Sequence, residues 1–261
     1  MLCSILISNY NKSKYVERCL NSLNEQTYKN IEIIFSDNNS TDNSIEIASK
    51  FKNIKIIKTQ RISNFPAINQ IDAIDNAFLH SKGEFIFLLD SDDFFEKEKI
   101  SKVINFHKTY KEDFIRDIPS LYYNKKKIKK FDIRNNINYF RTWPIIFPTS
   151  TLSFTKKFYL NFKNFLHSNN FKKLEIDFRL NVYANVNKKI SQLNDRLTFY
   201  NQTQDGIMSS YKKFDKNWWE RRMQGHQYLQ KIMSQKNLKH KRNLDYLCTC
   251  FVNIINQKIK Y

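Results

Sequence analysis

The first 110 residues alternate short apolar runs with segments whose apolar residues recur at helical spacing. The apolar runs cover residues 3–7, 31–35, 54–57 and 85–89. The segments between them follow the spacing of Val16, Cys19, Leu20 and Leu23. Strands and helices that alternate in this way build a mostly parallel sheet with helices on its faces. The sequence therefore predicts an α/β fold.

The alternation stops near residue 113, and the rest of the chain is less regular. Residues 143–150 are apolar but contain two prolines, which suits a pocket-lining loop better than a helix. Residues 172–184 have a helical pattern, and residues 196–200 resemble a strand. We expect one α/β region in residues 1–112, a second region of the same domain in residues 113–215, and a helical tail in residues 216–261.

Three carboxylates, Asp90, Asp92 and Asp93, follow the apolar run 85–89. Ligands of open α/β sheets bind beyond the carboxyl ends of the strands, where these side chains are expected. Carboxylates packed together raise one another's pKa unless a cation lies among them. A divalent cation that bridges them to substrate phosphates would resolve this repulsion. The alternative is that Asp92 or Asp93 caps the next helix.

A second polar turn follows the strand at 31–35. Asp37 is expected at the same sheet edge as Asp90, and Asn39 suits a left-handed turn conformation where glycine is usual. Asp37 and Asn38 could accept hydrogen bonds from a nucleobase. The alternative is a plain Asx turn that starts the next helix. The chain has only three glycines, which excludes a Rossmann fingerprint and a P-loop.

The formal net charge of +19 raises the question of an anionic partner. Lys outnumbers Arg, and Asn and Ile are abundant, as an AT-rich coding sequence produces without selection for a partner. No nucleic-acid-binding module is recognisable, so we expect no nucleic acid partner. Attraction to anionic lipid is the functional use that we expect of the charge.

The cysteines and the hydropathy of the chain indicate its location. The four cysteines form no metal-binding spacing, which predicts reduced structural thiols. No apolar stretch approaches the ~20 residues of a membrane span, and the N-terminus lacks the pattern of a signal peptide. These features predict a cytoplasmic protein, with peripheral contact at the inner face of the membrane.

Three ordered segments resemble the family 2 inverting glycosyltransferases. They are residues 5–11 (ILISNYN), residues 22–42, which end in SDNNSTD, and residues 82–93 (KGEFIFLLDSDD). The resemblance implies a GT-A fold, a nucleotide-sugar donor, and Mn²⁺ or Mg²⁺ held by Asp90, Asp92 and Asp93. A UDP-sugar is the favoured donor. The implied donor-binding residues are Ser8, Asn9, Tyr10, Asp37, Asn38, Asn69, Asp90 and Ser91.

This sequence departs from the family pattern at two places in the donor region. Many members have Asp-Asp-Gly-Ser after the second strand, whereas this chain has Asp37 followed by Asn38, Asn39 and Ser40. Asn38 can still accept from a uracil or thymine N–H, without charge. Residues 65–70 lack the arginine of the usual Ala-Arg-Asn-x-Gly, although Asn69 is retained.

The resemblance also implies a catalytic base at the start of a helix below the acceptor site. Glu175 and Asp177 fit the family's acidic motif, commonly Glu-Asp-x-Asp, with Glu175 at the position of the usual catalytic aspartate. An inverting transfer needs such a base for the acceptor hydroxyl. We expect one of the two to act as the base, with Glu175 favoured. The alternative is that both only complement the helix dipole.

The predicted function is metal-dependent inverting transfer of a sugar to a hydroxyl of a glycan or lipid-linked acceptor. The product would belong to a surface polysaccharide, a lipopolysaccharide or a related glycan. One alternative enzyme class is a nucleotidyltransferase, which normally has a glycine-rich signature that is missing after the first strand here. The other alternative is a basic, non-catalytic binding protein with a degenerate site.

Overall fold

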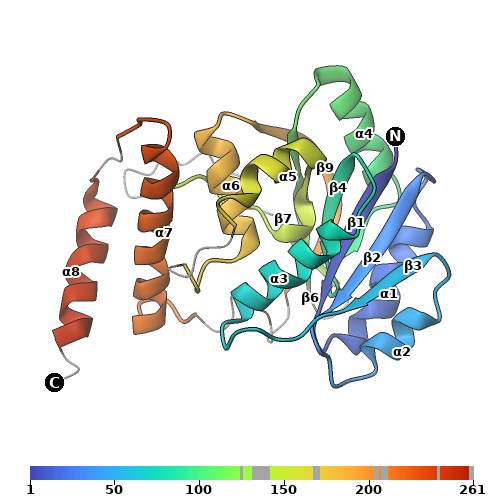
Figure 1. The fold of residues 1–261 in the computed structure, drawn as a ribbon, viewed down its shortest axis with the longest axis horizontal. Coiled ribbons are helices and arrows are strands. Elements are labelled where there is room, and N and C mark those ends of the chain that lie inside the picture. Colours follow the sequence, from blue (N-terminus) through green and yellow to red (C-terminus); the bar gives the residue numbers. More distant parts are fainter. Residues whose placement is uncertain are drawn as a thin grey trace.

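The computed structural model describes residues 1–123, 126–130, 142–166, 171–202, 206, 211–239 and 242–258, with backbone alone for 123, 126–130, 257 and 258. Within these residues, helices cover both faces of a single nine-stranded sheet (Figure 1). The prediction of an α/β fold with a mostly parallel nucleotide-binding type of sheet is confirmed.

The sheet has the strand order β3-β2-β1-β4-β8-β6-β9-β5, and β7 pairs with β6. The first four of these strands are parallel, whereas β8 runs antiparallel to both β4 and β6. The strands are β1 (Cys3–Asn9), β2 (Ile31–Asp37), β3 (Ile54–Lys58), β4 (Phe85–Asp90), β5 (Phe94–Phe95), β6 (Phe114–Tyr123), β7 (Lys126–Lys130), β8 (Leu152–Thr155) and β9 (Ile190–Asn201).

Alternate side chains of the central strands enter two separate apolar clusters, as the two-residue period of a strand requires. Ile5 and Phe87 face a cluster with helices α1 (Ser13–Asn24), α2 (Ser44–Ser49) and α4 (Lys99–Tyr110). Leu6 and Leu88 face a cluster that includes α3 (Pro66–Leu79), α5 (Lys156–Lys163) and α6 (Ile176–Val186). Both faces are covered, which explains why these strands are continuously apolar in sequence.

The C-terminal part of the described chain is a pair of helices at one end of the molecule (Figure 1). Helix α7 (Lys216–Ser234) packs with its Tyr228 and Leu229 into the cluster that contains α6. Helix α8 (Leu244–Lys258) lies against α7, on the side away from the sheet. None of the helices in the described residues is long and apolar enough to cross a membrane.

A buried ion pair connects the second half of the sheet to the loop at residues 148–151. Lys99 Nζ lies 2.8 Å from Asp117 Oδ1 and donates to the carbonyl oxygen of Ser150 at 2.6 Å. Both charged side chains are fully buried. Separating the two groups would leave a buried charge without a partner, which is strongly unfavourable. The pair therefore holds α4, β6 and the short 3₁₀ helix η1 (Thr149–Thr151) in fixed positions relative to one another.

The predicted elements are present, with several differences at their ends. Helix α1 begins at Ser13, whose N–H donates to Asp42 Oδ2 in the turn after β2 at 2.8 Å. The predicted helix at 172–184 begins at Ile176, after a cap at Glu175. The predicted strand at 196–200 is the end of the longer β9. The sequence analysis missed β5 and β6. Strand β5 pairs antiparallel with β9, whereas β6 pairs antiparallel with β8 and parallel with β9.

Candidate active site

The carboxyl ends of β1, β2 and β4 meet at one edge of the sheet. The strand register sets Ser8 opposite Asp90 and Asn9 opposite Asp37. A pocket of about 690 Å³ opens at this edge, within the usual range for small-molecule sites. Of the predicted site residues, the pocket is lined by Ser8, Asn9, Tyr10, Asn38, Asn69, Asp90, Ser91, Asp92, Glu175 and Asp177.

Asp90 ends β4 at the floor of the pocket. Its Oδ1 accepts from Ser8 Oγ at 2.7 Å and from Gln70 Nε2 at 2.9 Å. Burial and the charge of Asp92 together raise the pKa of Asp90 to about 6, against the opposing effect of these hydrogen bonds. The ionised carboxylate is therefore under-stabilised, as expected of a group that awaits a cation.

The other two carboxylates of this turn have different surroundings. Asp92 lines the pocket, and its Oδ2 lies 3.0 Å from Lys12 Nζ. Asp93 is buried, and its two oxygens accept from Ser150 Oγ at 2.5 Å and from the backbone N–H of Asn201 at 2.7 Å. Asp93 thus joins the turn to η1 and to the end of β9. Asp90 and Asp92 are the two members of the predicted metal set that reach the pocket.

The chemistry of this edge fits a hard divalent cation. Asp90 and Asp92 offer carboxylate oxygens, the ligand type that Mg²⁺ and Mn²⁺ prefer. Gln70 also lines the pocket, and within the part of the chain that the structure describes its buried Oε1 has no hydrogen-bond partner. The described residues contain no group of three side chains arranged to hold a metal on their own. A cation here would therefore need substrate oxygens or water to complete its ligands.

In the turn after β2, the side chains of Asp37 and Asn38 have different surroundings. Asp37 is fully buried and accepts from Asn9 Nδ2 at 2.7 Å and from Ser40 Oγ at 2.6 Å, so it fixes the turn from inside. Asn39 has the predicted left-handed conformation, with φ of 59°. The structure thus places the predicted ligand Asp37 behind the wall that its neighbour Asn38 lines.

The amide of Asn38 has a fixed orientation. Its Nδ2 donates to Thr59 Oγ1 at 3.0 Å and to the carbonyl oxygen of Gln60 at 3.2 Å. Because a carbonyl oxygen can only accept, these bonds determine which amide atom is nitrogen. The buried Oδ1 of Asn38 has no hydrogen-bond partner among the described residues. This side of the pocket therefore offers one unused acceptor.

The loop after β3 contributes residues that the sequence analysis did not single out. The Arg61 guanidinium lies 4.0 Å from the centre of the Tyr10 ring, and both side chains line the pocket. Asn69, a predicted donor ligand, accepts from the backbone N–H groups of Ile62 and Ser63 and donates to the carbonyl oxygen of Ser63. Its amide thus shapes this loop, while Arg61 supplies a cation at the rim.

The two acidic residues at the start of α6 have unequal surroundings. Glu175 is buried, and its carboxylate receives hydrogen bonds from Arg221 Nε at 3.1 Å and from Arg221 Nη2 at 2.5 Å. Asp177 is partly exposed at the pocket wall, and its Oδ1 accepts from the N–H of Phe178 at 2.6 Å. Burial and the charge of Glu175 raise the pKa of Asp177 to about 8, although the Arg221 charge opposes the rise.

Arg221 was missed as a site residue, because the sequence around it indicates only the packing of a helix. It lies on α7, 46 residues from its partner Glu175. The pattern of α7 predicts which side of the helix is apolar but not which acidic residue a buried arginine will meet. In the sequence, only the two acidic residues at the start of α6 indicated that a positively charged side chain would lie nearby.

The comparisons with known proteins show the family of the chain. The family model of glycosyl transferase family 2 matches residues 4–167. The Escherichia coli UDP-Glc:alpha-D-GlcNAc-diphosphoundecaprenol beta-1,3-glucosyltransferase WfaP is 40% identical over 110 residues, which are 42% of this chain and 43% of that protein. The chain spans less than half the length of the first curated relatives that it matches.

Solved structures share the fold at low sequence identity. A Staphylococcus aureus TarS fragment in complex with UDP-GlcNAc aligns with a TM-score of 0.66 and 20% identity, over 88% of this chain and 67% of that one. The mannosyltransferase PcManGT from Pyrobaculum calidifontis, in complex with GDP-Man and Mn²⁺, aligns with a TM-score of 0.57 and 13% identity, over 92% of this chain and 65% of that one. With the family model matching more than half of its length, the chain belongs to glycosyl transferase family 2.

Proposed function

We propose that the protein transfers a sugar, with inversion, from a UDP-sugar to a hydroxyl of a surface glycan or of its lipid-linked precursor. One observation carries the proposal. A single pocket is lined by Asp90 and Asp92 at the end of β4 and by Asp177 at the start of α6. The first pair suits a cation and a diphosphate, and the third carboxylate suits proton removal. The names of the relatives WfaP and TarS support this class of substrate.

The nucleotide would lie between the ends of β1 and β2. The unused Oδ1 of Asn38 can accept the N3–H of uracil, the donor that a pyrimidine base offers on its Watson–Crick edge. Tyr10 is partly exposed beside it and has a flat ring on which a base can stack. A neutral acceptor at this position matches the N3–H of uracil, and this match supports UDP as the nucleotide of the donor.

Asp90 and Asp92 would hold Mn²⁺ or Mg²⁺ against the donor diphosphate. When bound, the ion neutralises charge on the departing nucleotide diphosphate. Neighbouring residues orient the two carboxylates at this site. Ser8 and Gln70 orient Asp90, and Asp93 holds the turn from behind through Ser150 and the N–H of Asn201. In this proposal Asp93 positions the ligands instead of joining them.

Asp177, in place of the favoured Glu175, would take the proton of the acceptor hydroxyl. The carboxylate of Glu175 already accepts two hydrogen bonds from the Arg221 guanidinium, so it is engaged and turned toward α7. Asp177 lines the pocket with a pKa of about 8, close to the range in which a general base is effective. Glu175 then raises the basicity of Asp177 through its charge.

The test is turnover of UDP-glucose and UDP-GlcNAc with Mn²⁺, measured as release of UDP. We expect release that is lost on chelation and that falls at least about a hundredfold in Asp92→Asn, because the variant loses charge at the diphosphate without a change of shape. A protein that binds glycans or nucleic acid without catalysis would release no UDP in either form.

Glu17→Gln is the matched control, since it removes one carboxylate from the exposed face of α1. Its UDP release should equal that of the unchanged protein. Turnover retained in Asp92→Asn would contradict the metal assignment. Release of pyrophosphate from a nucleoside triphosphate, instead of UDP from a UDP-sugar, would favour a nucleotidyltransferase.

A further inference from the structure

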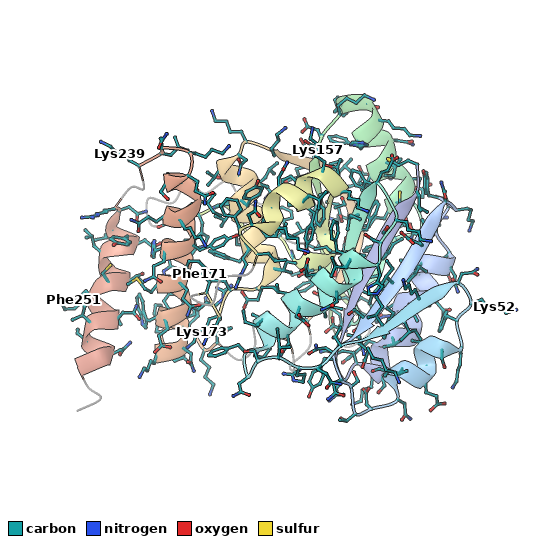
Figure 2. The ribbon with its side chains drawn as sticks, in the orientation of Figure 1. Lys52, Lys157, Phe171, Lys173, Lys239 and Phe251 are labelled. Atoms are coloured by element: carbon teal, nitrogen blue, oxygen red, sulfur yellow. The ribbon has the colours of Figure 1, made fainter. Side chains whose placement is uncertain are left out.

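Helix α8 has its polarity reversed relative to an ordinary surface helix. The side that faces the protein carries the buried residues Asp245, Thr249 and Asn253. The outer side carries large apolar residues, with Phe251 66% exposed and Leu247 53% exposed. The other exposed apolar residues of this side are Leu244, Ile254 and Ile255. Figure 2 shows Phe251 on the side of α8 away from α7, at the edge of the molecule.

Directional bonds fix this orientation of α8. Arg222 Nε of α7 donates to Asp245 Oδ1 at 2.7 Å, and Thr142 Oγ1 donates to Asp245 Oδ2 at 2.6 Å. Farther along the helix, Asn253 Nδ2 donates to the carbonyl oxygen of Trp219 at 3.1 Å. Rotating α8 to bury its apolar side would leave Asp245 and Arg222 without these partners. The apolar side therefore faces outward by construction.

The exposed apolar residues form one stripe. Their positions, three, four and seven apart, lie on one side of a helix with 3.6 residues per turn. The stripe runs from Leu244 to Ile255, so at 1.5 Å per residue it is about 17 Å long. This length is too short to span a bilayer but is enough to lie in its interface.

The charge around the stripe is of one sign. From residue 221 to residue 261 the sequence has nine lysine and arginine residues and one acidic residue, Asp245, which is buried. Lys236, Lys239 and Arg242 are exposed in the connection that leads into α8. Figure 2 shows Lys239 at this connection. An apolar stripe bordered by cations, with no exposed carboxylate on its helix, complements a surface that is apolar inside and anionic outside.

A second copy of the chain fits this surface less well. Two copies that meet through α8 would bring their cationic borders together, and each carries a formal charge of +19. Five side chains on one helix also cover less area than the roughly 800 Å² per partner of a stable interface. An anionic bilayer meets neither objection, since lipid headgroups neutralise the cations and acyl chains receive the stripe.

We infer that α8 docks the protein on anionic membrane surfaces, with Leu244, Leu247, Phe251, Ile254 and Ile255 entering the headgroup boundary and Lys236, Lys239 and Arg242 contacting lipid phosphates. The inference goes beyond the proposed function and does not depend on it. A helix docked in this way would bring the enzyme to acceptors that are themselves held in the membrane.

The experiment is flotation of the full chain with vesicles of phosphatidylcholine, alone or with about 30% phosphatidylglycerol. We expect flotation with the anionic vesicles only, weakened by high salt, since the cations supply part of the attraction. Leu247→Gln combined with Phe251→Gln should weaken partitioning about tenfold or more, because two apolar side chains no longer enter the bilayer. Lys239→Gln should weaken it about fivefold.

Leu160→Gln is the matched control, since Leu160 on α5 is also 53% exposed but lies outside the stripe. It should float like the unchanged protein. Thermal shift should show equal binding of UDP with Mn²⁺ in all these variants. This measurement distinguishes a docking defect from a defect in folding or in the donor site. Equal flotation of the double variant would overturn the inference. So would a dimer in sedimentation velocity that Phe251→Gln dissociates while anionic vesicles bind nothing.

Discussion

At the scale of single residues, the three carboxylates at the end of β4 lie in three different environments. Asp90 is half-buried and faces the pocket, Asp92 is paired with Lys12, and Asp93 accepts hydrogen bonds from Ser150 and Asn201. The same division occurs at α6, where Glu175 is paired with Arg221 and Asp177 is not. Pairs of acidic groups with unlike surroundings are where different chemical roles arise.

The assignment of the base predicts a pH profile. Because Asp177 must be ionised to accept a proton, and its pKa is raised to about 8, kcat/KM should rise with pH and level off above about 8. Asp177→Asn should lower kcat by roughly 10²–10⁴. Glu175→Gln should keep activity but move the rising limb to lower pH, since it removes a negative charge that raises the pKa of Asp177. Initial rates across pH 5–10 provide the measurement.

The reverse outcome is equally clear. If Glu175 is the base, Glu175→Gln loses activity at every pH, whereas Asp177→Asn keeps a profile of the unchanged shape. Circular dichroism of both variants checks that the amide substitutions leave the fold intact.

Some of these residue roles could be predicted from the sequence, and others could not. Parallel strands end at one edge, so the meeting of Asp90, Asp92 and Asn38 follows from the strand pattern. Whether Asp37 or Asn38 faces the pocket depends on the turn geometry and on hydrogen bonds to Asn9 and Ser40. The Glu175–Arg221 pair joins segments 46 residues apart, beyond any local pattern.

At the scale of elements, the first half of the sheet is set by local sequence, and the second half by long-range partners. The strands at 3–7, 31–35, 54–57 and 85–89 could be predicted because their apolar runs are bounded by turn residues. Strand β6 is interrupted by Asp117 and Pro119, so its pattern resembles a loop. Its partner Lys99 satisfies Asp117 inside the core, an arrangement that the sequence of α4 does not reveal.

The start of β4 packs so closely on β1 that Gly83 should not tolerate a side chain. A Cβ at Gly83 would lie 2.7 Å from the backbone nitrogen of Ser4 and 2.9 Å from the carbonyl carbon of Cys3. Gly83→Ala should therefore lower the free energy of unfolding by about 1–3 kcal/mol, since backbone atoms cannot move aside cheaply. Urea unfolding followed by circular dichroism measures the change.

Gly225→Ala is the matched comparison on helix α7. Its Cβ would meet the ring atoms of Phe178 at 3.0 Å and Trp143 at 3.3 Å, which can shift as side chains. Alanine also favours a helix over glycine by up to about 1 kcal/mol. The two effects should nearly cancel, so a loss in Gly225→Ala as large as in Gly83→Ala would contradict this account of the β1–β4 contact.

At the scale of the whole molecule, two ion pairs join the start of α6, helix α7 and helix α8 in series. Arg221 connects α7 to Glu175, and Arg222 beside it connects α7 to α8 through Asp245. Two adjacent arginines thus link the pocket to the outermost helix. The predicted division into regions 1–112, 113–215 and 216–261 stays a prediction, and the Glu175–Arg221 pair would join the last two of these regions.

The raised pKa of Asp90 predicts how the stability of the molecule responds to ligand and pH. In the folded protein, ionising Asp90 is unfavourable, because its pKa is raised from the ordinary value of 3.8 to about 6. Asp90 therefore lowers the free energy of unfolding as the pH rises from about 3.8 to about 6. A cation bound with UDP reverses that cost. At a hundred times Kd, UDP with Mn²⁺ at pH 7.5 should raise Tm by roughly 5–10 °C.

The same thermal shift should be smaller at pH 5, where a proton occupies Asp90 and competes with the cation. One pH unit below the pKa lowers the apparent affinity about tenfold. Asp90→Asn should abolish the shift at both pH values, and UDP with chelator serves as the control. An equal shift at pH 5 and pH 7.5 would disagree with the cation site at Asp90.

The register of β1 with its two neighbours has a consequence for how such a gene can change over generations. Ser8 meets Asp90 and Asn9 meets Asp37 only because three strands end level with one another. Inserting one codon inside β4 would turn its side chains to the opposite faces and misalign the site. Codons added to the loop at residues 60–64 would leave that alignment unaltered. Changes in the length of this loop can therefore alter substrate choice during evolution, whereas insertions in the strands would disrupt the site.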